Sequence, residues 1–247
     1  MACKGVGREF MERTRYKYLS VSAQQQGLPQ PPLQAPYSGE AEPIDLPAPD
    51  EIEVPEVDLR LAIEARESVR RYAEQPLSLA ELSYLLWCTQ GVKGVQGTYA
   101  TFRNVPSAGA RHALECYLLV NRVEGLQPGL YRFLALEHKL VAVDLEPGIS
   151  AAVAKACLDQ AMVQRCATTF IWVAVTERMT WRYGQRGYRY MHLDAGHVCQ
   201  NLYLAAESVG GGACAIAAFS DEDMNHLLGL DGEGQFVIYI ATMGKRP

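Results

Sequence analysis

Residues 168–175 read Thr-Thr-Phe-Ile-Trp-Val-Ala-Val, an almost continuous apolar run of strand length. Such a run is typical of a strand that lies in the centre of a sheet and is buried on both faces. Shorter β-rich segments on either side of it predict the rest of the sheet. They are residues 115–123, a hairpin of 129–133 with 139–143, and residues 213–218 and 236–243.

Helices are predicted between these strands by apolar periodicity and capping residues. Ser78 and Glu81 form a capping box that opens a helix ending at Gly91, with Leu82 and Leu85 on its apolar stripe. Because helices and strands mix without strict alternation, we expect an α+β fold. Further helices are expected within residues 1–20, from residue 59 into Arg66, and at 149–164, 190–209 and 220–228, with an irregular glycine-rich loop at 92–111.

The composition excludes several classes of protein. The 247 residues are 49% hydrophobic, enough to bury a sizeable core in one large domain or two small ones. A net charge of −5 argues against a nucleic-acid-binding protein. The sequence shows no apolar run of about eighteen residues and no signal peptide, so we expect no membrane partner. The seven cysteines lack Cys-x-x-Cys spacing and favour core thiols in the cytoplasm.

Residues 1–56 are interpreted as an N-terminal extension to a folded body at residues 57–247. Residues 1–20 are basic and aromatic, whereas residues 24–57 are rich in proline and glutamine and then in acidic residues. The second composition cannot hold a helix or a central strand. We therefore expect an extended, acidic arm that is mobile or wraps over a partner subunit.

The segment Arg66-Glu67-Ser68-Val69-Arg70 carries the clearest functional signal. If the preceding helix continued, Arg66 and Arg70 would stand four apart on one face, with the Ser68 hydroxyl nearby. Two planar guanidinium groups and a hydroxyl suit a phosphate monoester. If the basic tail residues Lys245 and Arg246 close on the same group, the segment is an anionic cofactor site. Otherwise it is an ordinary pair of surface arginines.

Three further segments each allow two interpretations. Pro106-Ser107-Ala108-Gly109 presents backbone N–H groups and a hydroxyl to a planar ring, or is a simple turn. Gly210-Gly211-Gly212 either only ends a helix, or ends a helix and also lets the following backbone approach a ligand. The arginine- and tyrosine-rich residues 182–190 line a substrate pocket or form an exposed helix start with stacked side chains.

Other kinds of site find little support. The sequence contains neither a Walker loop nor a strand-borne Gly-x-Gly-x-x-Gly. His192 and His197 stand five apart, off the helical spacing of metal ligands, so no metal site is expected. Asp194 beside them suggests a triad, but no serine sits in a Gly-x-Ser-x-Gly elbow. We interpret the three as polar residues along a helix near an interface.

Several short motifs follow one another in a defined order along about residues 57–246. They are Arg66-x-Ser68-x-Arg70-Arg71-Tyr72, Pro76-Leu77-Ser78 with Glu81-Leu82 and Leu85-Leu86-Trp87, residues 106–112, Gly129-Leu130-Tyr131-Arg132, residues 186–190, residues 193–197 with Gln200-Asn201-Leu202, and Gly212-Ala213. Each motif is weak alone, but the ordered set resembles the nitroreductase-like flavoproteins. Within them it is similar to the SagB-type (azoline) dehydrogenase branch.

This resemblance implies a nitroreductase fold, with a central, mostly antiparallel sheet flanked by helices, in an intertwined homodimer that holds FMN at its interface. It also implies a role for particular residues. Arg66, Ser68, Arg70, Lys245 and Arg246 would hold the FMN phosphate. Pro106, Ser107, Ala108 and Gly109 would approach the flavin from the partner chain, and the backbone of Gly212, Ala213 and Cys214 would face the ring edge and donate N–H near N5.

The sequence departs from the branch at one position. Azoline dehydrogenases of this branch resemble one another in a Lys-Tyr pair that assists proton removal, where this chain has Arg182-Tyr183. Arginine stays protonated and is a poor base. The change argues against azoline oxidation. Arg182 would instead stabilise a developing anion, and Tyr183 remains a candidate acid.

Two functions remain open from the sequence. The first is an FMN-dependent oxidoreductase that passes hydride through flavin N5 between NAD(P)H, or a small or peptidic substrate, and an electrophilic acceptor. The alternative is an FMN-binding scaffold or partner subunit of a peptide-modification complex with little turnover. Arg182 and the proline-rich arm motivate that alternative.

Overall fold

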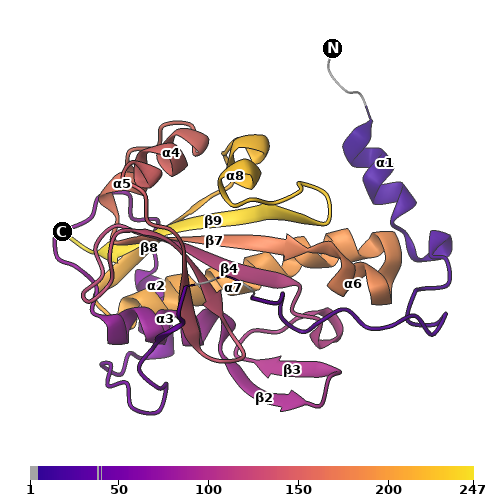
Figure 1. The fold of residues 1–247 in the computed structure, drawn as a ribbon, viewed down its shortest axis with the longest axis horizontal. Coiled ribbons are helices and arrows are strands. Elements are labelled where there is room, and N and C mark those ends of the chain that lie inside the picture. Colours follow the sequence, from indigo (N-terminus) through magenta and orange to yellow (C-terminus); the bar gives the residue numbers. More distant parts are fainter. Residues whose placement is uncertain (1–4, 38, 40) are drawn as a thin grey trace.

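A seven-stranded antiparallel sheet, in the order β1-β6-β5-β4-β7-β9-β8, organises the part of the chain that the computed structural model describes, residues 5–37, 39 and 41–247 (Figure 1). β7 lies inside this sheet between β4 and β9, and all its residues are buried, as the sequence predicts. The strands are β1 (Ile44–Asp45), β4 (Leu114–Val120), β5 (Gly129–Leu134), β6 (Lys139–Asp144), β7 (Thr168–Val175), β8 (Gly211–Ile216) and β9 (Gln235–Lys245).

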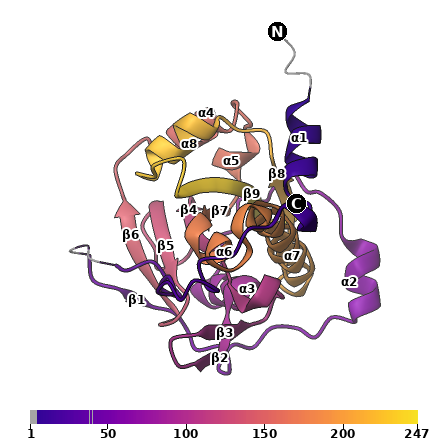
Figure 2. The same ribbon diagram turned by 90° about the vertical axis from the view of Figure 1, so that its right-hand side faces the viewer.

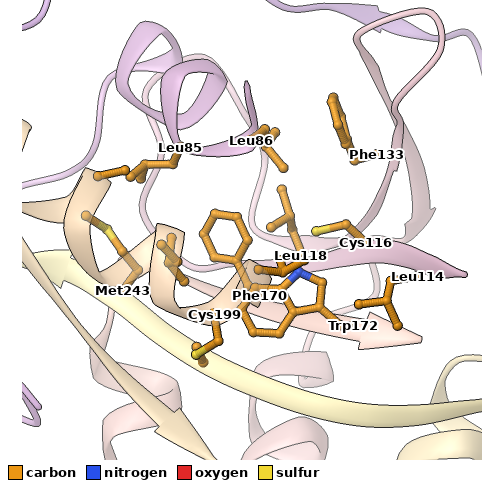
Figure 3. Packing of buried hydrophobic residues seen from close by; sticks show 14 of the residues in the cluster. Leu85, Leu86, Leu114, Cys116, Leu118, Phe133, Phe170, Trp172, Cys199 and Met243 are labelled. Carbon is orange, nitrogen blue, oxygen red and sulfur yellow. The ribbon is translucent and has the colours of Figure 1, made fainter. Parts of the chain in front are cut away.

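Helices cover both faces of the sheet. α3 (Leu79–Gln90) and α7 (Gly187–Ser208) pack on one face, and α4 (Ile149–Ala156), α5 (Met162–Arg165) and α8 (Asp221–Leu227) pack on the other. Figure 3 shows Leu85 and Leu86 of α3 over Phe170 and Trp172 of β7. Side chains along β4 alternate between the two cores, because successive residues of a strand point to opposite faces. The expected α+β class is confirmed.

Local capping signals are confirmed where the sequence shows them. Ser78 Oγ accepts a hydrogen bond from Glu81 N at 3.1 Å, and Ser78 N donates to Glu81 Oε2 at 2.9 Å. α3 ends at Gly91, as expected.

The remaining helices are α1 (Val6–Arg13), α2 (Leu59–Ala65) and α6 (Thr176–Tyr183), with short 3₁₀ turns η1 (Tyr16–Tyr18), η2 (Ala108–Ala110) and η3 (Gly184–Arg186).

Two segments differ from their prediction. Residues 92–103 form a hairpin of β2 (Val92–Gln96) and β3 (Ala100–Arg103), so the expectation of an irregular loop was wrong there. The glycines in this segment obscured the alternating strand pattern in the sequence. One of them, Gly97, adopts the left-handed backbone (φ 52°) that the hairpin turn requires. The single helix expected at 149–164 is divided into α4 and α5, because Leu158 and Asp159 adopt left-handed backbone with φ 57°.

The proline-rich arm, which we expected to be mobile or to wrap over a partner subunit, makes contacts with its own chain. Ala35 N donates to Glu115 Oε1 at 2.8 Å, and Arg178 Nε donates to Pro32 O at 2.8 Å. Further on, β1 pairs with the edge of β6. The arm is therefore an outer layer of the same subunit. Residues 38 and 40 of the predicted arm, and residues 1–4 of the extension, lie outside the described residues.

The described cysteines are free thiols, in agreement with the core role expected for them. Five are buried, and Cys88 is partly buried. Burial raises the pKa of the Cys199 thiol to about 12. Separately, none of the helices within residues 5–37, 39 and 41–247 is long and apolar enough to cross a bilayer.

Candidate active site

The Arg66–Arg70 segment is extended and lies along the outer edge of β8. α2 ends at Ala65, and Arg66 already has extended backbone (φ −55°, ψ 119°), so the helix does not continue through this segment. Val69 N donates to Ala213 O at 2.9 Å, and Ser68 pairs with Ala213 in a parallel bridge. Side chains of an extended segment repeat every second residue. Arg66, Ser68 and Arg70 therefore still share one side, while Val69 is buried.

Tyr203 of α7 supports this segment and was missed by the sequence analysis. The hydroxyls of Ser68 and Tyr203 are hydrogen-bonded at 3.1 Å, and Tyr203 OH also accepts from Ala215 N at 2.8 Å. The Arg66 guanidinium lies 5.3 Å from the centre of the Tyr203 ring. The only available signal was a tyrosine on an otherwise apolar helix face, whose buried hydroxyl requires a partner.

The segment carries unmatched positive charge. Within the described part of the chain, no carboxylate lies within salt-bridge distance of Arg66, Arg70 or Arg71, and Arg70 bonds only to the backbone oxygen of Ser68, at 3.3 Å. Guanidinium groups with free donors and an adjacent serine hydroxyl fit a phosphate monoester. These residues therefore meet the chemical requirement for the phosphate end of FMN.

The C-terminal tail reaches the same region, but its charges are already paired. Lys245 Nζ contacts Glu81 Oε1 at 2.5 Å and also donates to Val209 O. Arg246 contacts Glu67 at 2.7 Å and Glu207 at 2.6 Å. To bind a further anion, either cation would have to release its carboxylate partner or hold both anions at once.

β8 begins within the glycine run, at Gly211, and lies beside the arginine segment. A Cβ on Gly212 would lie 2.4 Å from Val69 Cγ2, so glycine is required for the close approach of the two segments. On the outer edge, Ala213 O is bonded to Val69 N and Ala215 N is bonded to Tyr203 OH. Cys214 is buried in the core on the α4 side, and burial raises the pKa of its thiol while Arg70 opposes that shift.

A second group of predicted residues lies at the start of α7. Gly109 has φ 59°, and a Cβ there would lie 2.4 Å from Tyr183 OH and 3.2 Å from Arg182 Cζ. The Pro106–Gly109 turn thus contacts the Arg182-Tyr183 pair. The Tyr183 ring also packs edge-on against Tyr190, with centroids 4.9 Å apart.

Asp194 lies beneath this turn. Its Oδ1 accepts from Ala108 N at 3.4 Å, while its buried Oδ2 has no hydrogen-bond partner among the described residues. Burial raises the pKa of Asp194, and a hydrogen bond from Ser107 opposes that shift. His192 and His197 are exposed on the same helix. Asp194 therefore serves the turn and forms no triad with these histidines.

The residues predicted to surround one cofactor thus form two separate groups in a single chain. Ser68 contacts α7 at Tyr203, and Ala108 contacts it at Asp194. Asp194 and Tyr203 are nine positions apart on α7, which corresponds to roughly 13 Å along the helix axis. Figure 1 shows β8 and the C-terminus at one end of the long axis and α6 at the other.

Comparison with known proteins agrees with this architecture. The sequence model of the nitroreductase family matches residues 63–245. The chain is 37% identical over 208 residues to MJ1384 of Methanocaldococcus jannaschii, whose name assigns it as a nitroreductase; the match covers 84% of this chain and 98% of that protein. It is 32% identical over 142 residues to the trifolitoxin-processing protein TfxB of Rhizobium leguminosarum bv. trifolii, covering 54% of this chain and 38% of TfxB.

A solved structure from Ralstonia eutropha, described as a nitroreductase, has a TM-score of 0.68 and 25% identity, and the match covers 89% of this chain and 99% of that one. The expected nitroreductase fold is therefore confirmed. From the family match, the relative in Methanocaldococcus and the fold together, the chain belongs to the nitroreductase family.

Proposed function

We propose that this protein is an FMN-dependent oxidoreductase in which Arg66, Ser68 and Arg70 hold the FMN phosphate. The observation that carries the proposal is a cluster of guanidinium groups without carboxylate partners among the described residues, carried on a segment whose backbone is hydrogen-bonded to β8. Each charge-assisted contact to a phosphate oxygen contributes about 1.5–3 kcal/mol. Lys245 and Arg246 would add to the clamp if the phosphate became a second anionic partner for them beside Glu81 and Glu67.

The remaining predicted residues are proposed to act across a homodimer. Pro106, Ser107, Ala108 and Gly109 of one subunit would meet the cofactor held by the other, beside Gly212, Ala213 and Cys214. The separation of the two groups along α7 supports this arrangement. Exposed apolar side chains on α2, from Leu59 to Ile63, supply a surface that a second subunit could cover.

FMN, when bound, supplies hydride transfer at N5, and the protein supplies orientation and proton handling. Tyr183 OH, held against Gly109, is proposed as the proton donor. Arg182, with its guanidinium 5.7 Å from the centre of the Tyr183 ring, would stabilise negative charge that develops on the substrate. NADH or NADPH is the proposed electron donor, and the free thiols favour a cytoplasmic location.

The SagB-type branch is also part of the proposal. It is supported by the ordered motifs and by the similarity to TfxB, a protein named for trifolitoxin processing. A small molecule or a peptide would then be the substrate. The alternative, an FMN-binding scaffold in a peptide-modification complex, is supported by the presence of arginine rather than lysine at position 182.

A visible spectrum of the purified protein, followed by anaerobic titration with NADPH and NADH, tests the function. We expect a yellow protein whose flavin absorbance bleaches with one donor. Flavin that neither nicotinamide nor a chemical reductant bleaches would favour the scaffold. A colourless protein that cannot be loaded with FMN would overturn both alternatives.

The phosphate assignment is tested by Arg66→Ala. Loss of a charge-assisted contact should weaken FMN binding about tenfold or more and lower the retained flavin per subunit. Arg165→Ala is the matched control, since Arg165 is exposed at the end of α5, on the face of the sheet away from the proposed interface and site residues. Equal flavin retention in the Arg66 variant and the control would show that the phosphate lies elsewhere.

A further inference from the structure

A cavity of about 490 Å³ lies between the arm, the β2–β3 hairpin and the end of α6. Leu28 of the arm, Phe102 of the hairpin and Trp181 of α6 form three of its walls. Gly109 and Arg182 border it as well. Its volume is in the range of pockets that take small organic ligands.

Hydrogen bonds to the arm fix these walls. Trp181 Nε1 donates to Leu28 O at 2.9 Å. Gln30 Nε2 donates to Thr98 O at 2.9 Å and to Tyr99 O at 3.0 Å, which joins the arm to the tip of the hairpin. The cavity is therefore formed before a ligand arrives, and little ordering entropy opposes binding.

Aromatic and aliphatic surface around the cavity is left uncovered. Leu28 is 52% exposed, Tyr99 is 69% exposed and Phe102 is 52% exposed. Such surface is stabilised when a planar apolar body covers it, and aromatic rings add favourable stacking geometry. The walls thus favour a ligand with an aromatic ring.

The charge at the cavity is positive only. Arg111 and Arg182 line it, no acidic residue does, and neither arginine has a salt bridge within the described residues. Arg111 is only 7% exposed; its Nε donates to Gly109 O and its Nη2 to Tyr99 O, while Nη1 has no hydrogen-bond partner among the described residues. Burial, and next the charge of Arg182, lower the pKa of Arg111. Two neighbouring cations without a counter-ion are stabilised by an anion.

We propose that this cavity binds an aromatic carboxylate, with the ring against Phe102 and Trp181 and the carboxylate at Arg182 and Arg111. The cavity touches Gly109 and Arg182, so this ligand would be the substrate; that assignment rests on the proposed flavin function. Anion binding itself does not depend on flavin. The arm then completes a substrate site beside the flavin that the other subunit would hold.

Calorimetric titration of the purified full chain with 2-naphthoate tests the proposal, with the FMN content of each sample recorded from its visible spectrum. We expect 2-naphthoate to bind at least tenfold more tightly than its uncharged amide, 2-naphthamide, and than acetate or inorganic phosphate. Arg182→Gln should weaken naphthoate binding about tenfold or more, and Phe102→Ala should weaken it severalfold. Arg165→Gln, an exposed arginine of α5 beyond the opposite face of the sheet, is the matched control and should bind as the wild type does.

Equal affinity for the acid and the amide, equal affinity for acetate, or unchanged binding in Arg182→Gln would each overturn the inference. Arg182 and Phe102 are exposed, so their variants should fold. A protein that holds FMN but does not bind naphthoate contradicts only this inference. A protein that binds naphthoate but never takes up FMN contradicts the proposed function and leaves the anion site standing.

Discussion

At the scale of single residues, the least predictable feature is the charge buried beneath the arm. Glu115 contacts Arg178 at 2.5 Å and Arg132 at 3.2 Å, and all three side chains are buried. Burial would raise the pKa of Glu115, but the charges of Arg178 and Arg132 outweigh it and lower that pKa. The sequence places Glu115 only at the start of a strand, because its partners lie far away along the chain.

His112 gives a pH prediction at the same scale. Burial, with the charge of Arg103 added, lowers its pKa from 6.5 to about 3. The unfolded chain therefore gains a proton below about pH 6.5 that the folded chain does not bind. The stability that depends on neutral His112 is complete above pH 6.5 and declines as the pH falls toward 3, by at most about 1.4 kcal/mol per pH unit.

We expect His112→Asn to reduce the loss of stability between pH 6.5 and 4. Asparagine is neutral and tolerates the left-handed backbone at this position, where φ is 43°. Urea unfolding of both proteins at several pH values measures the effect. The difference between the two curves isolates His112 from His138, whose pKa burial also lowers. Parallel curves would show that His112 becomes charged in the folded protein.

At the scale of elements, prediction succeeded where the signal is local. The capping box at Ser78 and the apolar run of β7 contain their own determinants, and both elements formed as expected. The hairpin at 92–103 and the extended course of residues 66–70 were missed. In the second case the helix stops because Val69 and Ser68 gain a partner in β8, which a local pattern does not contain.

The contact between this segment and β8 is tested by a double-mutant cycle. Gly212→Ala would place a Cβ 2.4 Å from Val69, so we expect a loss of about 1–3 kcal/mol in unfolding free energy. Val69→Ala removes the clashing methyl groups. The double variant should therefore be less destabilised than the sum of the single variants, as measured by urea denaturation of all four proteins. Strict additivity would mean that the two residues do not meet.

At the scale of the whole molecule, α2 lies on the outside of the subunit, where it contacts α7 through its buried Ala62 side (Figure 2). Leu59, Leu61 and Ile63 on this helix are 65%, 60% and 54% exposed. Apolar side chains grouped in this way are costly in water and mark surfaces that associate. Together with the two separated groups along α7, they favour an active site that is completed by a second subunit.

We therefore expect Leu61→Glu combined with Ile63→Glu to weaken dimer formation at least tenfold, because charges would be buried at the interface. Sedimentation equilibrium measures the change. Leu158→Glu is the control, since Leu158 is also 60% exposed but follows α4 on the other face of the sheet. A monomeric wild type, or an unchanged dimer in the α2 variant, would contradict the interface.

The sequence by itself determined the α+β class, the central strand, the capped helices and the family, because each depends on residues that are neighbours in the chain or on an ordered set of motifs. Tertiary structure alone decided that Arg66, Ser68 and Arg70 share the side of an extended segment, that Tyr203 contacts Ser68 and Asp194 contacts Ala108, and that the arm covers Glu115. Those outcomes depend on hydrogen bonds and charge pairs between distant residues, whose energies exist only once the sheet has brought them together.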